Sequence, residues 1–134
     1  MAQPDQPTDL RAFPIVYASD VERAAGFWEL IGFRRHVQLP PDGEPGYIGL
    51  RRGAQGPELA ISNGQWATDR YGMSIGDGPR FEMYIYVADL DAMLSQLAEA
   101  AVEILREPET MPWGERFATV ADTEGNPIAL CQQH

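Results

Sequence analysis

The 134-residue sequence contains little cysteine and little histidine, and it lacks any long apolar run. Its single cysteine, Cys131, excludes an internal disulfide, so we expect a cytoplasmic protein. No apolar segment approaches the ~20 residues of a membrane span, so we expect no membrane partner. The N-terminus is polar, contains proline and has no basic start, so we expect a flexible tail over residues 1–11 and not a signal peptide.

Positive charge is also scarce. Twenty Asp and Glu residues against ten Lys and Arg give a formal net charge of −10. Such a chain repels the phosphates of nucleic acid, so we expect no nucleic-acid partner. The acidity is compatible with a cationic small molecule, and it is also explained by solubility alone. With 44% hydrophobic residues the chain is able to bury the core of one domain, which we place at residues 12–134.

The chain nearly repeats itself at an offset of 69 residues. The identical pairs at this offset are Tyr17 with Tyr86, Asp20 with Asp89, Gly56 with Gly125, and Ala60 with Ala129. Around them the same pattern occurs twice: a strand, a helix capped by Asp, and three further strands with a Gly turn. This pattern predicts an α+β fold of two tandem βαβββ modules, which form a cupped sheet with the helices on its convex side.

The predicted modules span about residues 12–62 and 81–132, and residues 63–80 form a linker. In the first module we expect strands at 13–18, 33–39, 47–51 and 58–62, and a helix from 21 to 31. In the second we expect strands at 81–87, 102–105, 116–121 and 128–131, and a helix from 90 to 101. Trp28 lies on the apolar stripe of the first helix and is predicted to be a core residue.

Side chains alternate between the two faces of a strand, which identifies the residues on the concave side. The face turned to the helices is apolar, as at Val16, Ile85 and Ile128. The alternate positions are Phe13, Ile15, Tyr17, Glu58, Ala60, Ser62, Glu82, Tyr84, Tyr86, Ala129 and Cys131. This second set mixes aromatic, acidic and small residues. A closed core would not select Glu82, so the pattern indicates a cleft.

Two segments, residues 13–33 and 113–130, resemble the opening and closing segments of the vicinal oxygen chelate superfamily. That superfamily includes glyoxalase I, extradiol dioxygenases and bleomycin-resistance-type antibiotic-binding proteins, and the chain resembles the last group most closely. The resemblance covers about residues 12–132.

The resemblance also indicates where a metal site would lie in this sequence. Metal-dependent members place four ligands on the first and last strands of the modules, and these positions correspond to Phe13, Ala60, Glu82 and Ala129. Only Glu82 carries a donor atom, and Glu58 on the face of Ala60 is a candidate for a second. We predict His36 to lie on another strand, away from these positions. Two carboxylates without histidine form a poor transition-metal site, so we expect no metal and no cofactor.

Members that lack the metal often sequester a drug in an aromatic groove at a dimer interface. The resemblance therefore implies a homodimeric, non-catalytic binding protein whose partner is a small-molecule antibiotic or a related natural product. No residue is predicted to be catalytic. The candidate ligand-binding residues are Trp113, Trp66, Tyr47, Tyr84, Tyr86, Glu82, Phe13 and Arg116.

Several of these candidates also have a purely structural interpretation. Trp113 is compatible with packing of its own loop, and Trp66 with a loop anchor or a dimer contact. Glu82 is either an acceptor for a cationic or hydroxylated ligand group or a salt-bridge partner of Arg80, Arg116 or Arg11. A second function stays open, an enzyme of the same fold that uses Glu82 as metal ligand or general base. A third is a carrier of a biosynthetic intermediate.

Overall fold

The computed structural model describes residues 11–133, with the exception of the Trp66 side chain, and it contains two modules of the same plan. The first comprises β1 (Ile15–Tyr17), α1 (Val21–Leu30), β2 (Arg34–Leu39), β3 (Tyr47–Arg51) and β4 (Glu58–Ser62). The second comprises β5 (Met83–Tyr86), α3 (Leu90–Glu99), β6 (Ile104–Thr110), β7 (Arg116–Ala121) and β8 (Pro127–Gln132). Helix α2 (Gly64–Tyr71) lies between them. The predicted tail falls almost wholly outside the described residues.

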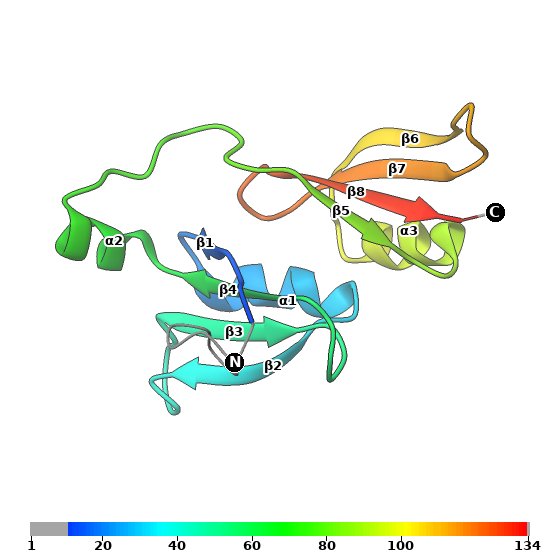
Figure 1. The fold of residues 1–134 in the computed structure, drawn as a ribbon. Coiled ribbons are helices and arrows are strands. Elements are labelled where there is room, and N and C mark those ends of the chain that lie inside the picture. Colours follow the sequence, from blue (N-terminus) through cyan, green and yellow to red (C-terminus); the bar gives the residue numbers. More distant parts are fainter. Residues whose placement is uncertain (1–10, 134) are drawn as a thin grey trace, which may run out of the picture.

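Each module forms its own four-stranded sheet, with the orders β1-β4-β3-β2 and β5-β8-β7-β6 (Figure 1). The first strand of each module pairs parallel with the last, and the other pairs are antiparallel. One helix covers one face of each sheet. The predicted α+β fold of two tandem βαβββ modules is therefore confirmed, with two separate sheets. β1 is an edge strand, as expected for a strand that begins directly after Pro14.

The two helices begin at equivalent residues of the repeat. The carboxylates of Asp20 and Asp89 each accept a hydrogen bond of 3.0 Å from the backbone N–H three residues later, at Arg23 and Ala92. These bonds satisfy N–H groups that have no partner within the first turn of a helix. The repeat in the sequence therefore corresponds to a repeat of helix capping.

The core spans both modules and is centred on Trp28, which is 1% exposed and confirmed as a core residue. Its ring meets those of Phe27 and Phe33 edge-on, at centroid distances of 5.2 and 5.5 Å. It stacks on Phe81 of the second module at 6.5 Å. The helix of one module is therefore packed against the beginning of the other. Within the described part of the chain, no helix is long and apolar enough to cross a membrane.

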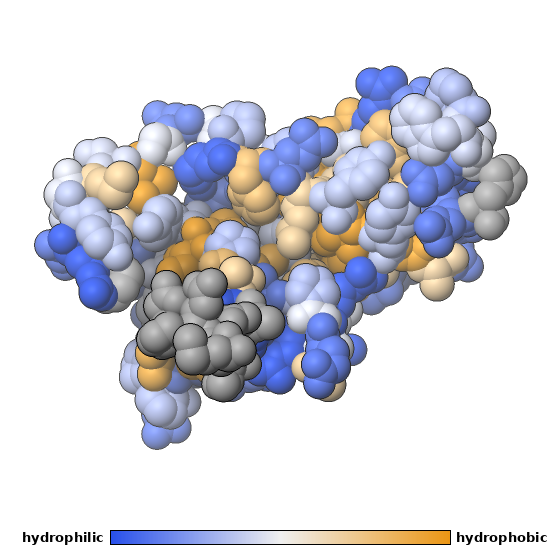
Figure 2. Space-filling model, in the orientation of Figure 1, coloured by the Kyte–Doolittle hydropathy of each residue, from blue (hydrophilic) through white to orange (hydrophobic). Residues whose placement is uncertain are grey.

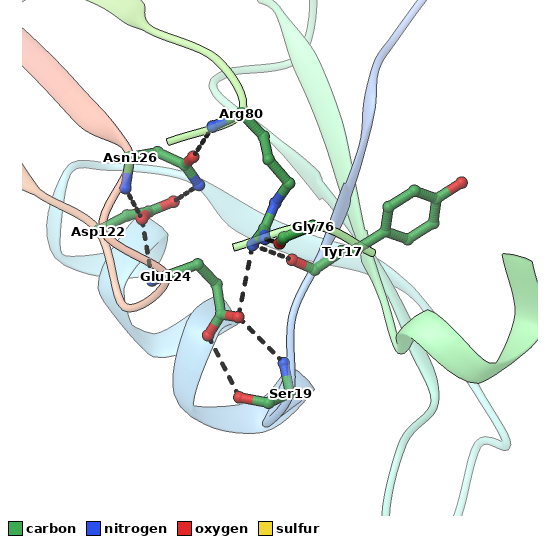
Figure 3. A network of polar contacts seen from close by, with 7 residues as sticks. All are labelled: Tyr17, Ser19, Gly76, Arg80, Asp122, Glu124 and Asn126. Carbon is green, nitrogen blue, oxygen red and sulfur yellow. Dashed lines mark hydrogen bonds and ion pairs between the residues drawn. The ribbon is translucent and has the colours of Figure 1, made fainter. Parts of the chain in front are cut away.

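A polar network joins the modules at the turn between β7 and β8 (Figure 3). Glu124 accepts hydrogen bonds of 3.3 Å from the backbone N–H and the hydroxyl of Ser19, at the start of α1. Its carboxylate also lies 3.6 Å from Nη2 of Arg80. Asn126, which is fully buried, accepts from the backbone N–H of Arg80 at 2.8 Å and donates to Asp122 at 2.9 Å. The network therefore fixes the orientation of one module relative to the other.

Two arginines add a further link between the modules. Arg80 donates to the carbonyl of Tyr17 at 3.4 Å, and Arg52 donates to the carbonyl of Tyr86 at 2.7 Å. Tyr17 and Tyr86 are equivalent residues of the repeat, and each ends the first strand of its module. In both modules, therefore, the last carbonyl of the first strand accepts a hydrogen bond from an arginine that lies outside that strand.

Strands β1 and β5 are shorter than the predicted 13–18 and 81–87, and two other elements differ more. Helix α2 lies in the segment predicted to be a linker without regular structure, and the hydroxyl of Thr68 bonds the carbonyl of Gly64 one turn earlier. Strand β6 begins at Ile104 and runs to Thr110, beyond the predicted end at residue 105. It accommodates Pro108 because it is an edge strand whose pairing with β7 shifts register twice.

Candidate ligand-binding site

The sheet of the second module has one face in the core and one open face. The core face presents Ile85, Ala118, Val120, Ile128 and Leu130. Alternation places Tyr84, Tyr86, Phe117, Thr119, Ala129 and Cys131 on the open face. In the register of the sheet, Tyr84 pairs with Ala129, and Tyr86 and Phe117 both pair with Cys131. Large rings therefore surround two small, buried side chains.

These rings form a cluster that we call the aromatic face, defined by Tyr84, Tyr86, Trp113 and Phe117. The rings of Tyr84 and Tyr86 lie 6.1 Å apart and almost perpendicular, at 83°. Tyr84 also meets Phe117 at 6.2 Å. Tyr84, Tyr86 and Trp113 remain 47%, 46% and 64% exposed. Exposed aromatic rings that are clustered and fixed by one another form a surface able to bind a flat or conjugated ligand.

Glu115 contacts residues of this face and is not among the residues predicted from the sequence. Its carboxylate accepts a hydrogen bond of 2.8 Å from the indole Nε1–H of Trp113. It also interacts with the hydroxyl of Tyr86 and the thiol of Cys131. Glu115 precedes β7 by one residue and continues the alternation of Thr119 and Phe117, so extending that pattern by two residues would have identified it.

The environment of Glu115 keeps its neighbours protonated. The hydrogen bond from the hydroxyl of Tyr86 to this carboxylate is the main cause that raises the pKa of Tyr86, and desolvation adds to it. Desolvation first, and then the negative charge of Glu115, raises the pKa of the Cys131 thiol. The pKa of Tyr84 is raised by desolvation and by the nearby anionic groups, which include Glu82. The aromatic face therefore presents neutral donors around one carboxylate.

The first module has an open face of different character. A groove of about 370 Å³ on this module is lined by Leu39, Pro40, Gly46, Tyr47, Ser62 and Asn63. Desolvation, assisted by the charge of Glu58, raises the pKa of Tyr47, so its phenol stays neutral. Phe13 precedes β1 and is exposed. The groove is small and mostly apolar, as expected for part of a ligand site.

A charged cluster lies around Glu58 on the same module. His36 lies on β2, another strand than the four family positions, as predicted, and its Nε2 reaches to 3.2 Å from the carboxylate of Glu58. The cause is a register shift between β2 and β3, which inserts His36 as an extra residue opposite Gly49. A Cβ on Gly49 would lie 3.3 Å from Nε2 of His36, so the glycine makes room for the ring.

The contacts of His36 fix its tautomer. Nη2 of Arg51 lies 3.1 Å from Nδ1, and a guanidinium group only donates. Nδ1 is therefore the acceptor, and Nε2–H donates to Glu58. Arg11 lies 3.5 Å from the same carboxylate, whose side chain is 8% exposed. The charge of Glu58 is consequently compensated within the protein.

The residues at the four family positions do not fit a catalytic metal. Phe13, Ala60 and Ala129 have no donor atom, and Glu82 stands alone. Across residues 11–133, no group of three or more His, Cys, Asp or Glu side chains is placed to hold a metal ion. Glu58, the candidate for a second oxygen ligand, is engaged by His36 and Arg11. The donor set is therefore unsuited to a transition metal.

The structure brings some predicted site residues together and separates others. Tyr84, Tyr86 and Trp113 belong to one cluster, while Tyr47 and Phe13 lie on the first module. Arg116 points to the helix side, where Nη1 lies 3.2 Å from both carboxylate oxygens of Asp91 in α3, so it does not reach the aromatic face. Trp66 lies in α2, and its side chain is outside the described residues.

Glu82 is exposed, and the salt bridge considered for it is not formed. The three candidate partners Arg80, Arg116 and Arg11 pair instead with Glu124, Asp91 and Glu58. No ion pair of Glu82 occurs in the part of the chain that the structure describes. Its charge is nevertheless close enough to Tyr84 to raise the pKa of that phenol.

The space-filling view relates these features to the molecular surface. Figure 2 shows apolar surface in the middle of the molecule, over the sheets of both modules, with hydrophilic side chains around it. Exposed large apolar or aromatic residues of the sheets or their ends are Phe13, Ile15, Val37, Leu39, Tyr84, Tyr86, Leu105 and Trp113. Such apolar surface over open sheet faces is typical of sites that bind a ligand or another protein.

Comparison with known proteins gives a family match over nearly the whole chain. Residues 11–130 match the model of the glyoxalase/bleomycin resistance protein/dioxygenase superfamily. No curated protein sequence matches the chain significantly.

Solved structures show the same fold at low identity. TioX from Micromonospora sp. ML1 is 20% identical with a TM-score of 0.73, over 94% of this chain and 100% of that one. A superfamily member from Sphaerobacter thermophilus DSM 20745 is 22% identical with a TM-score of 0.71, over 93% and 98%. Lactoylglutathione lyase from Agrobacterium tumefaciens is 15% identical with a TM-score of 0.66, over 95% of each chain.

Proposed function

Because the chain belongs to the glyoxalase/bleomycin resistance protein/dioxygenase superfamily, known also as the vicinal oxygen chelate superfamily, we propose a function from the residues of its open sheet faces. The protein is a non-catalytic binding protein that sequesters an aromatic natural-product antibiotic and so protects the cell from it. The observation that carries this proposal is the aromatic face. Its rings are clustered, half exposed and held above the small floor residues Ala129 and Cys131.

The chemistry of this face suits binding without reaction. Stacking and desolvation of a conjugated ligand need no nucleophile and no metal from the protein. Cys131 is fully buried and its thiol pKa is raised, so it is a poor nucleophile. The three family positions without donor atoms argue against metal-dependent lyase or dioxygenase chemistry in this chain.

The proposed assembly is a homodimer whose second copy completes the groove. Within one chain each sheet has its open face on the side away from its own helix, and these faces expose Ile15 and Tyr84. A ligand on such a face is covered on one side only, whereas small-molecule sites commonly bury most of the ligand. A second copy placed over these faces would cover the other side. Sedimentation analysis with and without ligand tests this, and a monomer with saturating ligand contradicts it.

A thermal-shift screen over DNA-damaging antibiotics is the first test of the function. A ligand at ~100 times its Kd stabilises the folded state by about 2.7 kcal/mol, which is a measurable increase in Tm. We expect at least one aromatic antibiotic to raise the Tm and to be recovered chemically unchanged by mass spectrometry. A modified ligand after incubation overturns the claim of binding without catalysis.

A pair of matched variants tests whether the ligand binds at the aromatic face. Tyr84→Leu removes a ring of the face, and Tyr71→Leu makes the same change on α2, far from the second module in Figure 1. We expect Tyr84→Leu to weaken binding about tenfold, ~1.4 kcal/mol. Tyr71→Leu should leave the Kd unchanged. Equal effects of the two variants contradict the proposed location of the site.

A second candidate is a metal-free enzyme with Glu82 as general base. The observation in its favour is that Glu82 is near Tyr84 and forms no ion pair with other residues of the described chain. Glu82→Gln should then abolish turnover of a ligand that the native protein modifies. If the native protein returns every bound antibiotic unmodified, this candidate fails.

A further inference from the structure

Within the part of the chain that the structure describes, the charge of Glu115 has no positive partner. Among residues 11–133, no arginine or histidine side chain forms an ion pair with its half-buried carboxylate. Glu58 on the first module provides the contrast, because the guanidinium group of Arg11 lies 3.5 Å from its carboxylate and compensates its charge. A carboxylate that is partly removed from water gains more from a cation than an exposed carboxylate does. The aromatic face therefore contains an anion that a ligand is able to neutralise.

The groups that contact Glu115 orient it without neutralising it. The indole of Trp113 donates at 2.8 Å, and the hydroxyl of Tyr86 and the thiol of Cys131 also interact with the carboxylate. All three are neutral donors, and the raised pKa values of Tyr86 and Cys131 keep them so. The carboxylate is consequently oriented by neutral donors and not by a cation.

The rings around Glu115 add a second attraction for positive charge. The face of an aromatic ring is electron-rich and attracts a cation within about 6 Å, most strongly at tryptophan. Tyr84 and Tyr86 are perpendicular at 83°, so they present differently directed surfaces to one group. Nearby arginines do not occupy the face, since Arg116 pairs with Asp91 and Arg106 with Glu109. Ring faces favour weakly hydrated organic cations over strongly hydrated inorganic ions.

We infer that the aromatic face binds an organic ammonium group, with Tyr84, Tyr86 and Trp113 around it and Glu115 as its counter-ion. This inference rests on the proposed function and deepens it, because it assigns the ligand to the class of aromatic molecules that carry a protonated or quaternary amine. The net charge of −10 also raises the concentration of cations near the protein. The cation and the aromatic part of the ligand are then recognised by the same cluster.

The test uses two probes of equal shape, choline and 3,3-dimethylbutan-1-ol, which differ in having nitrogen or carbon at the branch point. The readout is the NMR resonance of the Trp113 indole N–H, assigned with Trp113→Phe. This group bonds Glu115, so a cation at the carboxylate shifts it directly. We expect choline to shift this resonance saturably and the neutral alcohol to leave it unchanged. In about 1 M salt the choline affinity should fall.

Variants separate the charge from the rings. Glu115→Gln keeps the shape and removes the charge, and it should weaken choline binding about tenfold or more. Glu109→Gln is the control for net charge, because Arg106 already neutralises Glu109 at 2.6 Å. It should leave the affinity for choline unchanged. Tyr84→Phe retains the ring and should bind choline, whereas Tyr84→Leu should not. Circular dichroism confirms that each variant is folded.

The outcomes distinguish this inference from the proposed function. If choline and the alcohol shift the resonance equally, or if Glu115→Gln binds choline as tightly as the native protein, the ammonium site is wrong. The antibiotic screen then still decides the proposed function. If choline binds as predicted but no antibiotic binds, the proposed function fails. The ammonium site is then still supported.

Discussion

The ends of the two helices allow a quantitative test of the internal repeat. Phe33 donates its backbone N–H to the carbonyl of Trp28 at 3.1 Å, and Val102 donates to that of Leu97 at 3.0 Å. Both pairs are related by the 69-residue offset. Between them the chain passes through a residue of positive φ, Gly32 at +105° in the first module and Ala101 at +63° in the second.

The residue types at these two positions predict opposite effects of substitution. A residue with a Cβ in the left-handed region destabilises the folded state by about 1–2 kcal/mol, and glycine avoids this strain. Glycine also makes the unfolded chain more flexible, which favours the unfolded state by about 0.4–1 kcal/mol. Ala101→Gly should therefore raise the free energy of unfolding by about 0.5–1 kcal/mol. The Ala101 methyl is exposed, so its loss forfeits little burial. Gly32→Ala introduces the strain and reduces the flexibility of the unfolded chain, so it should lower the free energy of unfolding by about 0.5–1 kcal/mol.

Urea denaturation of the two variants beside the native protein measures these differences. The expected result is a higher midpoint for Ala101→Gly and a lower one for Gly32→Ala, at unchanged m. The space at Gly32 is open, because a Cβ would meet only Nε of Arg52 at 3.8 Å. Steric crowding therefore does not explain a loss there. If Ala101→Gly lowers the midpoint or leaves it unchanged, the explanation from backbone strain is refuted.

Three further predictions concern stability and ionisation. Gly26→Ala should stabilise the protein by about 0.8–1.0 kcal/mol in urea titrations, since Gly26 lies inside α1 and a Cβ would meet nothing within 4 Å. Asn126→Ala should destabilise it by about 2–5 kcal/mol, because Asp122 and the N–H of Arg80 each lose a partner. The raised pKa of Tyr86 means that this phenol stabilises the fold below its ordinary pKa of 10.0 and that the contribution is lost as pH rises through the higher folded value. Tyr86→Phe should therefore flatten the loss of stability measured above about pH 10.

The sequence predicts most of the fold because its patterns are local. Strands β3, β4 and β7 begin and end at the predicted residues, since alternating apolar side chains define them between turn residues. Strand β6 extends further because Glu107 and Pro108 are tolerated at a sheet edge, which depends on the other strands. Helix α2 was missed since it is short and polar and lies between glycines.

The candidate site is predicted less completely, because contacts across the sheet decide it. Alternation identified Tyr84 and Tyr86, and the superfamily resemblance identified Trp113. Glu115 was missed because it lies one residue before the predicted strand, although the same alternation includes it. The contact of His36 with Glu58 was not predicted, because it depends on the bulge in β2, and the sequence shows no sign of that bulge except the small residue Gly49 beside the ring.

The most direct test of the central claim is to map the binding site of an antibiotic that raises the Tm. In NMR titrations, we expect the largest shifts at the aromatic face, with the Trp113 indole N–H among them. The competing location is a cavity of about 350 Å³ on the helix side, where Phe27 and Leu30 of α1 face Val102. Shifts confined to that cavity, with the Trp113 resonance unchanged at saturation, would contradict binding at the aromatic face.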